Sequence, residues 1–222
     1  MLLGLAAFAL ALLLVAPVRG LVVRIGWLDK PNHRKLHVGS VPLAGGLLIA
    51  STAAIMILSG HLWNPPAWQL WAAAAMIFVI AFIDDRFPIR ARFRLTVQLV
   101  AAILVAESAE WVLPSLGRSL GPFELGLGVL ALPFTVLGIA ALTNAINMTD
   151  GIDGMAGGLV AASLWWLLVG FVLVSRDLWV FSGGAMIADA EQAIGTARAI
   201  AVLIGATLAF LVFNQRTPWR ST

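Results

Sequence analysis

Three short polar stretches interrupt an otherwise apolar chain, and their residue types suit the chemistry of phosphates and a divalent metal. They cover residues 29–37, 84–86 and 144–154. The second and third contain four carboxylates in two pairs, and the first is rich in cations. Carboxylates hold Mg²⁺ together with substrate phosphates, and cations offset the charge of a transferring phosphoryl group. The sequence therefore predicts a site for a metal and a phosphorylated substrate at a membrane surface.

The first acidic pair, Asp84 and Asp85, stands at the end of an apolar run. Adjacent carboxylates repel each other, so two of them beside hydrocarbon are costly unless cations compensate. Four arginines follow at once: Arg86, Arg90, Arg92 and Arg94. Two interpretations stay open. One is a solvated turn whose arginines anchor the helix end, and the other is a site where one or both carboxylates meet Mg²⁺ or take a proton.

The second acidic pair is interleaved with amides and glycines. Asp150 and Asp153 are three residues apart, and Asn144 and Asn147 have the same spacing upstream. On a helical backbone such positions share a face. The glycine that follows each aspartate permits a tight turn and close approach to a ligand. Asn and Asp are also common turn residues at helix ends, but four of them among glycines favour a binding site.

The first polar stretch is cationic. Its basic and imidazole side chains are Lys30, His33, Arg34, Lys35 and His37. One interpretation is a cluster attracted to anionic lipid headgroups, worth about 1 kcal/mol per cation near the surface. The other is a clamp on phosphates. Taken alone, these residues favour the first interpretation.

Paired glycines begin two of the apolar runs. Gly45 and Gly46 follow Pro42, and they suggest a bent or closely packed entry into that run. Gly157 and Gly158 begin a later run and would allow close packing against another helix.

The composition places the chain in lipid. It has 222 residues, of which 61% are hydrophobic and 11% charged, with a mean hydropathy of +0.97. A soluble chain of this length could not hide so much apolar surface. There is no cysteine, so disulfide and thiolate chemistry are excluded. The sequence pI of 10.6 does not indicate nucleic acid binding, because the loops mix arginine with paired aspartate and lack interleaved aromatic residues.

The apolar runs predict an all-α, polytopic membrane protein with about seven transmembrane helices in a single domain, residues 1–222. Helices are expected because no run shows the alternation of a barrel strand. The fourth run is short for a span that needs about 20 residues. The seven runs are Leu2–Val18, Val41–Gly60, Ala67–Ile83, Phe93–Ala106, Leu127–Ile146, Met155–Ser175 and Ala193–Phe213.

The basic residues predict the orientation. If successive connections alternate between the two sides, eleven of the fourteen Lys and Arg residues fall on one side, together with all three polar stretches. Cytoplasmic loops carry an excess of Lys and Arg. We therefore expect a multi-pass protein of the bacterial inner membrane, with its N-terminus outside and its active-site loops in the cytoplasm.

The order and wording of these motifs resemble the polyprenyl-phosphate N-acetylhexosamine-1-phosphate transferases, of glycosyltransferase family 4 type. The second and third motifs are closest to the subgroup that transfers N-acetylglucosamine-1-phosphate. The resemblance covers essentially the whole chain. Its matching stretches are residues 29–31 with Arg34, Lys35, His37, Pro42, Gly45 and Gly46, then 84–87 with Gln98, then 144–158.

The resemblance implies an activity, a metal and a set of roles. A sugar-1-phosphate would pass from a UDP-N-acetylhexosamine to undecaprenyl or another polyprenyl phosphate, releasing UMP, in cell-envelope polysaccharide biosynthesis. Mg²⁺ would be required, with Mn²⁺ as an alternative, and a homodimer is left open. Catalytic and metal-binding roles carry over to Asp84, Asp85, Asp150 and Asp153. Substrate-binding roles carry over to Lys30, Arg34, Lys35, His37, Arg92, Asn144 and Asn147.

The chain departs from the family pattern in two places. Arg92 stands where the family often has lysine, which keeps the charge but not the geometry of a point charge. Residues 208–214 resemble the segment before a later Met-Gly-Asp-x-Gly-Ser motif, and the sequence stops at Thr222 before that motif. We therefore expect an N-terminal portion of a ten- to eleven-helix fold, with little or no catalysis by itself.

Two other functions stay open. One is a transporter or ion relay built on membrane acids, although the acids gather on one side and no inverted repeat is visible. The other is a non-catalytic lipid-binding remnant. Metal-dependent release of UMP separates the enzyme from both.

Overall fold

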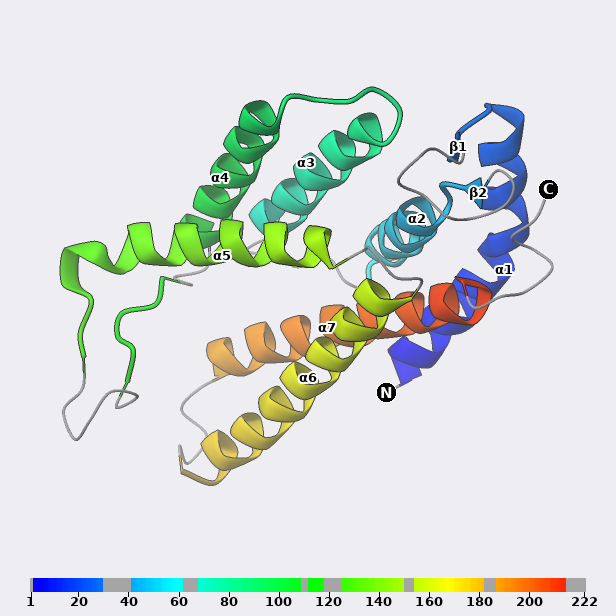
Figure 1. The fold of residues 1–222 in the computed structure, drawn as a ribbon. Coiled ribbons are helices and arrows are strands. Elements are labelled where there is room, and N and C mark those ends of the chain that lie inside the picture. Colours follow the sequence, from blue (N-terminus) through cyan, green and yellow to red (C-terminus); the bar gives the residue numbers. More distant parts are fainter. Residues whose placement is uncertain are drawn as a thin grey trace. The chain divides into compact units, whose positions relative to one another are not determined.

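The protein is described by a computed structural model that covers residues 2–29, 41–61, 68–108, 112–117, 125–149, 154–181 and 187–214. Side chains within residues 174–193 are not described. Within these ranges the chain forms seven α-helices, and one 3₁₀ turn at Gly128–Leu130 (Figure 1). The helices are α1 (Leu2–Arg24), α2 (Gly45–Leu58), α3 (Trp68–Asp84), α4 (Ala91–Ser108), α5 (Ala131–Met148), α6 (Met155–Phe181) and α7 (Ile187–Asn214).

Each of the seven predicted apolar runs is a helix, so the all-α prediction is confirmed. Among the helices that the structure describes, four are long and apolar enough to cross a membrane. They are α1, residues Gly128–Met148 (the 3₁₀ turn with α5), residues Met155–Leu173 of α6 and residues Ile194–Asn214 of α7. A helix rises about 1.5 Å per residue, so about 20 residues cover the hydrocarbon core of a bilayer. The protein is a multi-pass membrane protein.

Helix α2 is shorter than the predicted run of residues 41–60, because its first residues form a different structure. Val41 and Pro42 make strand β2, which pairs antiparallel with strand β1, Leu28–Asp29. Pro42 lies opposite Leu28 in this two-residue ladder. Helix α2 therefore has 14 residues and, with the 17-residue α3, is an apolar helix shorter than a full span.

Helix α4 is as long as α5, yet it is not apolar enough to count as a candidate span. Its first turn carries Arg92 and Arg94, and Glu107 stands near its end. Charged side chains cost several kcal/mol at the centre of a bilayer and are tolerated near helix ends. The fourth predicted run is confirmed as a helix, and that it crosses the membrane stays a prediction. Its charged ends explain why its apolar stretch is short.

The described residues divide into two compact units. Residues 1–63 and 149–222 form the first unit, with α1, α2, α6, α7 and the β1–β2 pair. Residues 64–148 form the second unit, with α3, α4 and α5. The single domain expected from the sequence stays a prediction.

In the first unit, α7 packs against α1, α2 and α6. Its contact with α1 is made by small residues that bring the two backbones together. A Cβ atom added at Gly4 would lie 2.9 Å from the carbonyl oxygen of Ala201, and one added at Gly205 would overlap the backbone of Gly4 and Phe8. Small residues at such a crossing allow helices in a membrane to gain close van der Waals contact.

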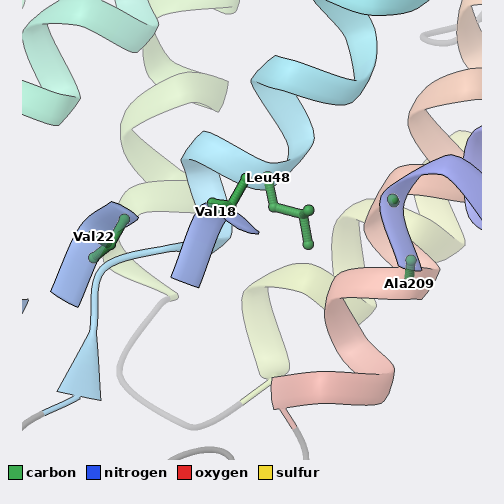
Figure 2. Packing of buried hydrophobic residues seen from close by; sticks show 5 residues of the cluster. Val18, Val22, Leu48 and Ala209 are labelled. Atoms are coloured by element: carbon green, nitrogen blue, oxygen red, sulfur yellow. The ribbon is translucent and has the colours of Figure 1, made fainter. Parts of the chain in front are cut away.

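The same unit buries a hydrophobic cluster drawn from three helices. Val18 and Val22 come from α1, Leu48 from α2 and Ala209 from α7 (Figure 2). Phe210 packs against this cluster. Its ring occupies the space beside Gly45, where an added Cβ would overlap it, so the predicted close entry into α2 is confirmed.

The two glycines at the start of α6 differ in how closely another helix packs against them. A Cβ atom at Gly157 would lie 2.9 Å from Cδ2 of Leu211 on α7, which confirms close packing at this position. A Cβ atom added at Gly158 would meet no described atom outside its own helix backbone within 4 Å. Gly154, just before the helix, has a φ of 78°, a left-handed conformation that favours glycine.

In the second unit, α4 packs against both α3 and α5. Helices α3 and α4 lie side by side and are joined by the loop of residues 85–90 (Figure 1). Toward the far end of α4, the buried residues Ala102 and Ala106 form a cluster with Val136 of α5. The near end of α4 carries the polar contacts described below.

Candidate functional site

Five of the predicted site residues are described, and all five belong to the second unit. They are Asp84, Asp85, Arg92, Asn144 and Asn147. The other six lie outside the described residues: Lys30, Arg34, Lys35, His37, Asp150 and Asp153. The structure therefore tests the local geometry of the first acidic pair and of the two amides.

Asp84 is the last residue of α3, and its carboxylate organises the loop that follows. Oδ1 accepts a hydrogen bond of 2.8 Å from the backbone N–H of Ile89. Oδ2 accepts a hydrogen bond of 2.9 Å from Nη1 of Arg94, in the first turns of α4. The side chains of Asp84 and Arg94 are 22% and 31% exposed. One carboxylate thus closes the loop and ties the end of α3 to the start of α4.

Asp85 has a different environment although it is the next residue. Its backbone N–H still donates to the carbonyl oxygen of Ala81 at 3.0 Å, so it continues the last turn of α3. Its side chain is exposed, whereas that of Asp84 is partly buried. Asp85 is therefore the more accessible carboxylate of the pair for a ligand that arrives from the aqueous side.

The arginines around this pair divide in the same way. Arg94 is committed to Asp84. Arg92 is exposed on the first turn of α4, as are Arg86 and Arg90 in the loop. The guanidinium carbon of Arg86 lies 5.8 Å from the centre of the Phe87 ring, within the range of a cation–π contact. The exposed arginines keep their charge available to an anionic ligand.

The two predicted amides lie on α5 but do different things. Nδ2 of Asn144 donates to Oε1 of Gln98 on α4 at 2.7 Å, and to the carbonyl oxygen of Ala140 at 3.0 Å. Gln98 is only 5% exposed. Asn147, three residues further along, is exposed. The two amides lie on one helix with the expected spacing and differ in accessibility, whereas Asp150 and Asp153 lie outside the described residues.

Sequence reasoning did not assign a role to Arg94 or Gln98. Gln98 was part of the family resemblance, but nothing in its spacing pointed to Asn144, 46 residues away. Arg94 stood among four arginines with no sign of which one would pair with an aspartate. The available signal is a glutamine within an apolar run, because such a residue needs a hydrogen-bond partner once the run is buried.

The described part of the chain contains no group of three or more His, Cys, Asp or Glu residues that could hold a metal ion. Asp84 and Asp85 supply carboxylate oxygens there, and the second acidic pair lies outside the described residues. Carboxylate and amide oxygens are the protein ligands that suit Mg²⁺. The residues fit a hard divalent cation in their chemistry.

Comparison with known proteins gives a consistent result. A family model described as glycosyl transferase family 4 matches residues 67–218. The chain is 36% identical over 180 residues to an undecaprenyl-phosphate alpha-N-acetylglucosaminyl 1-phosphate transferase of Yersinia pestis, covering 79% of this chain and 48% of the relative. The protein of the same name from Escherichia coli K12 is 33% identical over 169 residues, covering 74% of this chain and 46% of that protein.

A more distant relative extends the match over most of the sequence. The chain is 31% identical over 208 residues to a probable undecaprenyl-phosphate N-acetylglucosaminyl 1-phosphate transferase of Bacillus subtilis, covering 92% of this chain and 53% of the relative. The chain spans about half the length of the curated relatives it matches.

Proposed function

Because the chain belongs to glycosyl transferase family 4, we propose that the protein takes part in transferring N-acetylglucosamine-1-phosphate from a UDP-sugar to undecaprenyl phosphate, with release of UMP. The observation that carries the proposal is the match to relatives of this named activity at 31–36% identity over most of the chain. The polar residues at the ends of α3 and α5 support it, because they are the types that phosphate transfer needs.

The proposed reaction makes one bond and breaks one. An oxygen of the lipid phosphate forms a bond to the phosphorus that carries the sugar. The bond from that phosphorus to the oxygen bridging to UMP breaks, and UMP leaves. Phosphoryl transfer depends mainly on positioning and on neutralising charge, so the protein must supply cations, a base and a fixed geometry.

Asp85 is the described carboxylate best suited to meet the lipid phosphate, because it is exposed at the end of α3. It would accept a proton from that phosphate or bind the divalent metal ion of the proposed site. Asp84 supports this arrangement by holding the loop of residues 85–90 through Ile89 and Arg94. Arg92, with the cations Lys30, Arg34 and Lys35 of the first loop, would receive phosphate charge.

The metal required by this proposal is Mg²⁺, with Mn²⁺ as an alternative. Asp84, Asp85, Asp150 and Asp153 would hold it, since carboxylates are the oxygen ligands that Mg²⁺ takes alongside substrate phosphates. When bound, the ion withdraws negative charge from the diphosphate during transfer. Asn147 is an exposed amide that would support this site from the end of α5.

The proposed location is the cytoplasmic face of the bacterial plasma membrane. It rests on the basic residues of the connections, which favour the cytoplasm. The chain contains no cysteine, so single cysteines report the orientation cleanly. A cysteine at Arg90 should resist a membrane-impermeant thiol reagent in intact cells and react after lysis. Reaction of this cysteine in intact cells would reverse the proposed orientation.

The activity is tested with the complete gene product that carries this sequence, in membranes supplied with radiolabelled UDP-N-acetylglucosamine and undecaprenyl phosphate. We expect labelled lipid and UMP in equal amounts, loss of both with EDTA, and recovery with Mg²⁺. A chimera in which residues 1–214 replace the matching part of the Yersinia pestis relative should also be active. Nucleotide-independent ion flux, or lipid binding without UMP release, would favour a transporter or a lipid-binding protein instead.

A further inference from the structure

Helix α4 presents one face on which polar and small residues follow each other at intervals of four. Arg94, Gln98, Ala102 and Ala106 occupy this face, since residues four apart in a helix are neighbours. Arg94 pairs with the end of α3, and Gln98 pairs with α5 one turn later. The two alanines are buried against α5 beyond that point. One helix thus contacts the ends of both elements that carry the polar motifs of the second unit.

Helices α4 and α5 pack antiparallel to each other. Gln98, early in α4, meets Asn144, late in α5. Ala106, late in α4, lies in one cluster with Val136, early in α5. The small apolar side chains set how closely the helices approach, and they tolerate sliding along each other. The amide pair is a directional contact between the described residues of these two helices, so it distinguishes one register from its neighbours.

The donors of Asn144 are fully used. A side-chain amide carries two N–H groups, and Asn144 gives one to Gln98 and one to the carbonyl oxygen of Ala140. Phosphate oxygens only accept hydrogen bonds, so Asn144 has no donor to offer them in this arrangement. Asn147 lies on the same side of α5, about one turn closer to the C-terminal end of that helix, and is exposed.

We propose that Gln98 is a positioning residue for the transfer reaction: its partly buried hydrogen bond to Asn144 fixes α5 against α4, so that Asn147 rather than Asn144 offers amide donors to the phosphates of the ligand. This proposal rests on the transferase function proposed above. It revises the sequence-based role of Asn144 from a substrate contact to a partner of Gln98, and it adds Gln98 to the residues on which the reaction depends.

The first test measures the hydrogen bond itself and needs no activity. Gln98→Ala, Asn144→Ala and the double variant are unfolded in a mild detergent, using the full 222-residue chain. Interhelical hydrogen bonds in membrane proteins couple their partners by an amount equal to roughly a threefold change in the unfolding equilibrium, and up to about twentyfold. We expect coupling in this range. Strictly additive effects of the two substitutions would overturn the pairing.

The matched control is a second pair on the same two helices. The hydroxyl of Thr96 donates to the carbonyl oxygen of Arg92, and the hydroxyl of Thr143 donates to that of Ile139, each within its own helix. Thr96→Ala, Thr143→Ala and their double variant should show no coupling. They should also leave transferase activity close to that of the wild type.

The second test separates positioning from ligand contact in the complete gene product. Gln98→Ala and Asn144→Ala should each lower kcat roughly tenfold, since small displacements of reacting groups are costly. KM for the UDP-sugar should stay within about twofold, and the double variant should be no worse than either single one. The exchanged pair, Gln98→Asn with Asn144→Gln, should recover much of the lost kcat because it keeps both amides.

Three outcomes would overturn the proposal. One is a normal kcat in Gln98→Ala, which would show that the reaction does not depend on the pair. Another is a collapse in Asn144→Ala that the exchanged pair does not relieve, together with a raised KM, which would return Asn144 to the ligand. The third is an inactive wild-type protein, which would refute the proposed function and with it the positioning role, while the unfolding test still decides whether the pair is formed.

Discussion

The two units join their helices differently: both pack small residues closely, and the second unit adds polar side-chain contacts between helices. In the first unit, α1 and α7 meet through Gly4 and Gly205, and their backbones come into contact. In the second unit, α4 is joined to its neighbours by an ion pair and an amide pair. Close packing gives a large gain spread over many atoms but little directional information. Polar contacts give less energy each but specify which residue faces which, and here they lie at the ends where the candidate site residues stand.

The difference suggests a division of tasks within the chain. The glycine contact would stabilise the pair of α1 and α7 without placing a site residue. The contacts of α4, by contrast, would set the geometry of Asp85 and Asn147. Substitutions in the first unit should therefore change folding first, and substitutions in the second unit should change activity first. The following predictions test this contrast in order of decreasing effect.

The largest expected effect is in the first unit. Gly205→Ala would place a methyl group against the backbone of Gly4 and Phe8, which no side-chain rotation relieves. Overpacking typically costs 1–3 kcal/mol, and we expect a loss of about 3 kcal/mol in the free energy of unfolding in detergent. Gly20→Ala, in α1 where an added Cβ would meet nothing within 4 Å outside its own helix backbone, is the matched control and should be neutral or slightly stabilising. Equal stability of the two variants would contradict the close contact of α1 and α7.

The next effect is in the second unit and on rate rather than on folding. Asp85→Asn keeps the size of the side chain and removes its charge. Loss of one charge facing a metal-bound diphosphate should lower metal-dependent transfer by about a hundredfold, with little change in unfolding because Asp85 is exposed. Asp84→Asn should lower both. Glu107→Gln, an exposed residue at the other end of α4, should leave transfer unchanged, and a collapse there would mean that the site has been placed on the wrong residues.

A third substitution sharpens the meaning of close packing. A methyl group at Gly157 would meet Cδ2 of Leu211, the far end of a flexible side chain. The leucine can turn aside, and alanine favours the helix by up to about 1 kcal/mol over glycine. We expect Gly157→Ala to change the free energy of unfolding by no more than about 1 kcal/mol. A loss as large as that of Gly205→Ala would show that α6 is held as rigidly against α7 as α1 is.

Sequence patterns predicted the helices better than their partners. Apolar runs and paired glycines identified all seven described helices and two of the close contacts, at Gly45 and Gly157. They did not predict that Val41 and Pro42 would pair with β1, because that ladder depends on a partner strand thirteen residues earlier in the chain. Periodicity reports which face of a helix is apolar, not which helix covers it.

The candidate site shows the same limit. The chemistry of their side chains made Asp84, Asp85 and Asn147 candidate site residues. In the structure, Asp85 and Asn147 are exposed. The assignment of Asn144 to the substrate did not foresee its bond to Gln98, which spans 46 residues. An amide that binds a ligand and an amide that binds a neighbouring helix look identical in a sequence, because the same donors serve both purposes.

The smallest expected effect concerns the ion pair that closes the α3–α4 loop. Arg94→Met keeps much of the side chain's length and removes the hydrogen bond to Oδ2 of Asp84, while the Ile89 N–H still bonds to Oδ1. Both partners are partly exposed, and pairs of this kind contribute about 0.2–1 kcal/mol. We expect a loss within that range in the free energy of unfolding, decreasing in high salt, and a fall in kcat of a few fold as the loop loosens. Arg90→Met removes an exposed charge from the same loop and should leave the free energy of unfolding unchanged. If the two substitutions were equally mild in stability and rate, the loop would owe its shape to the Ile89 bond alone, and the polar contacts of the second unit would reduce to the pairing of Gln98 with Asn144.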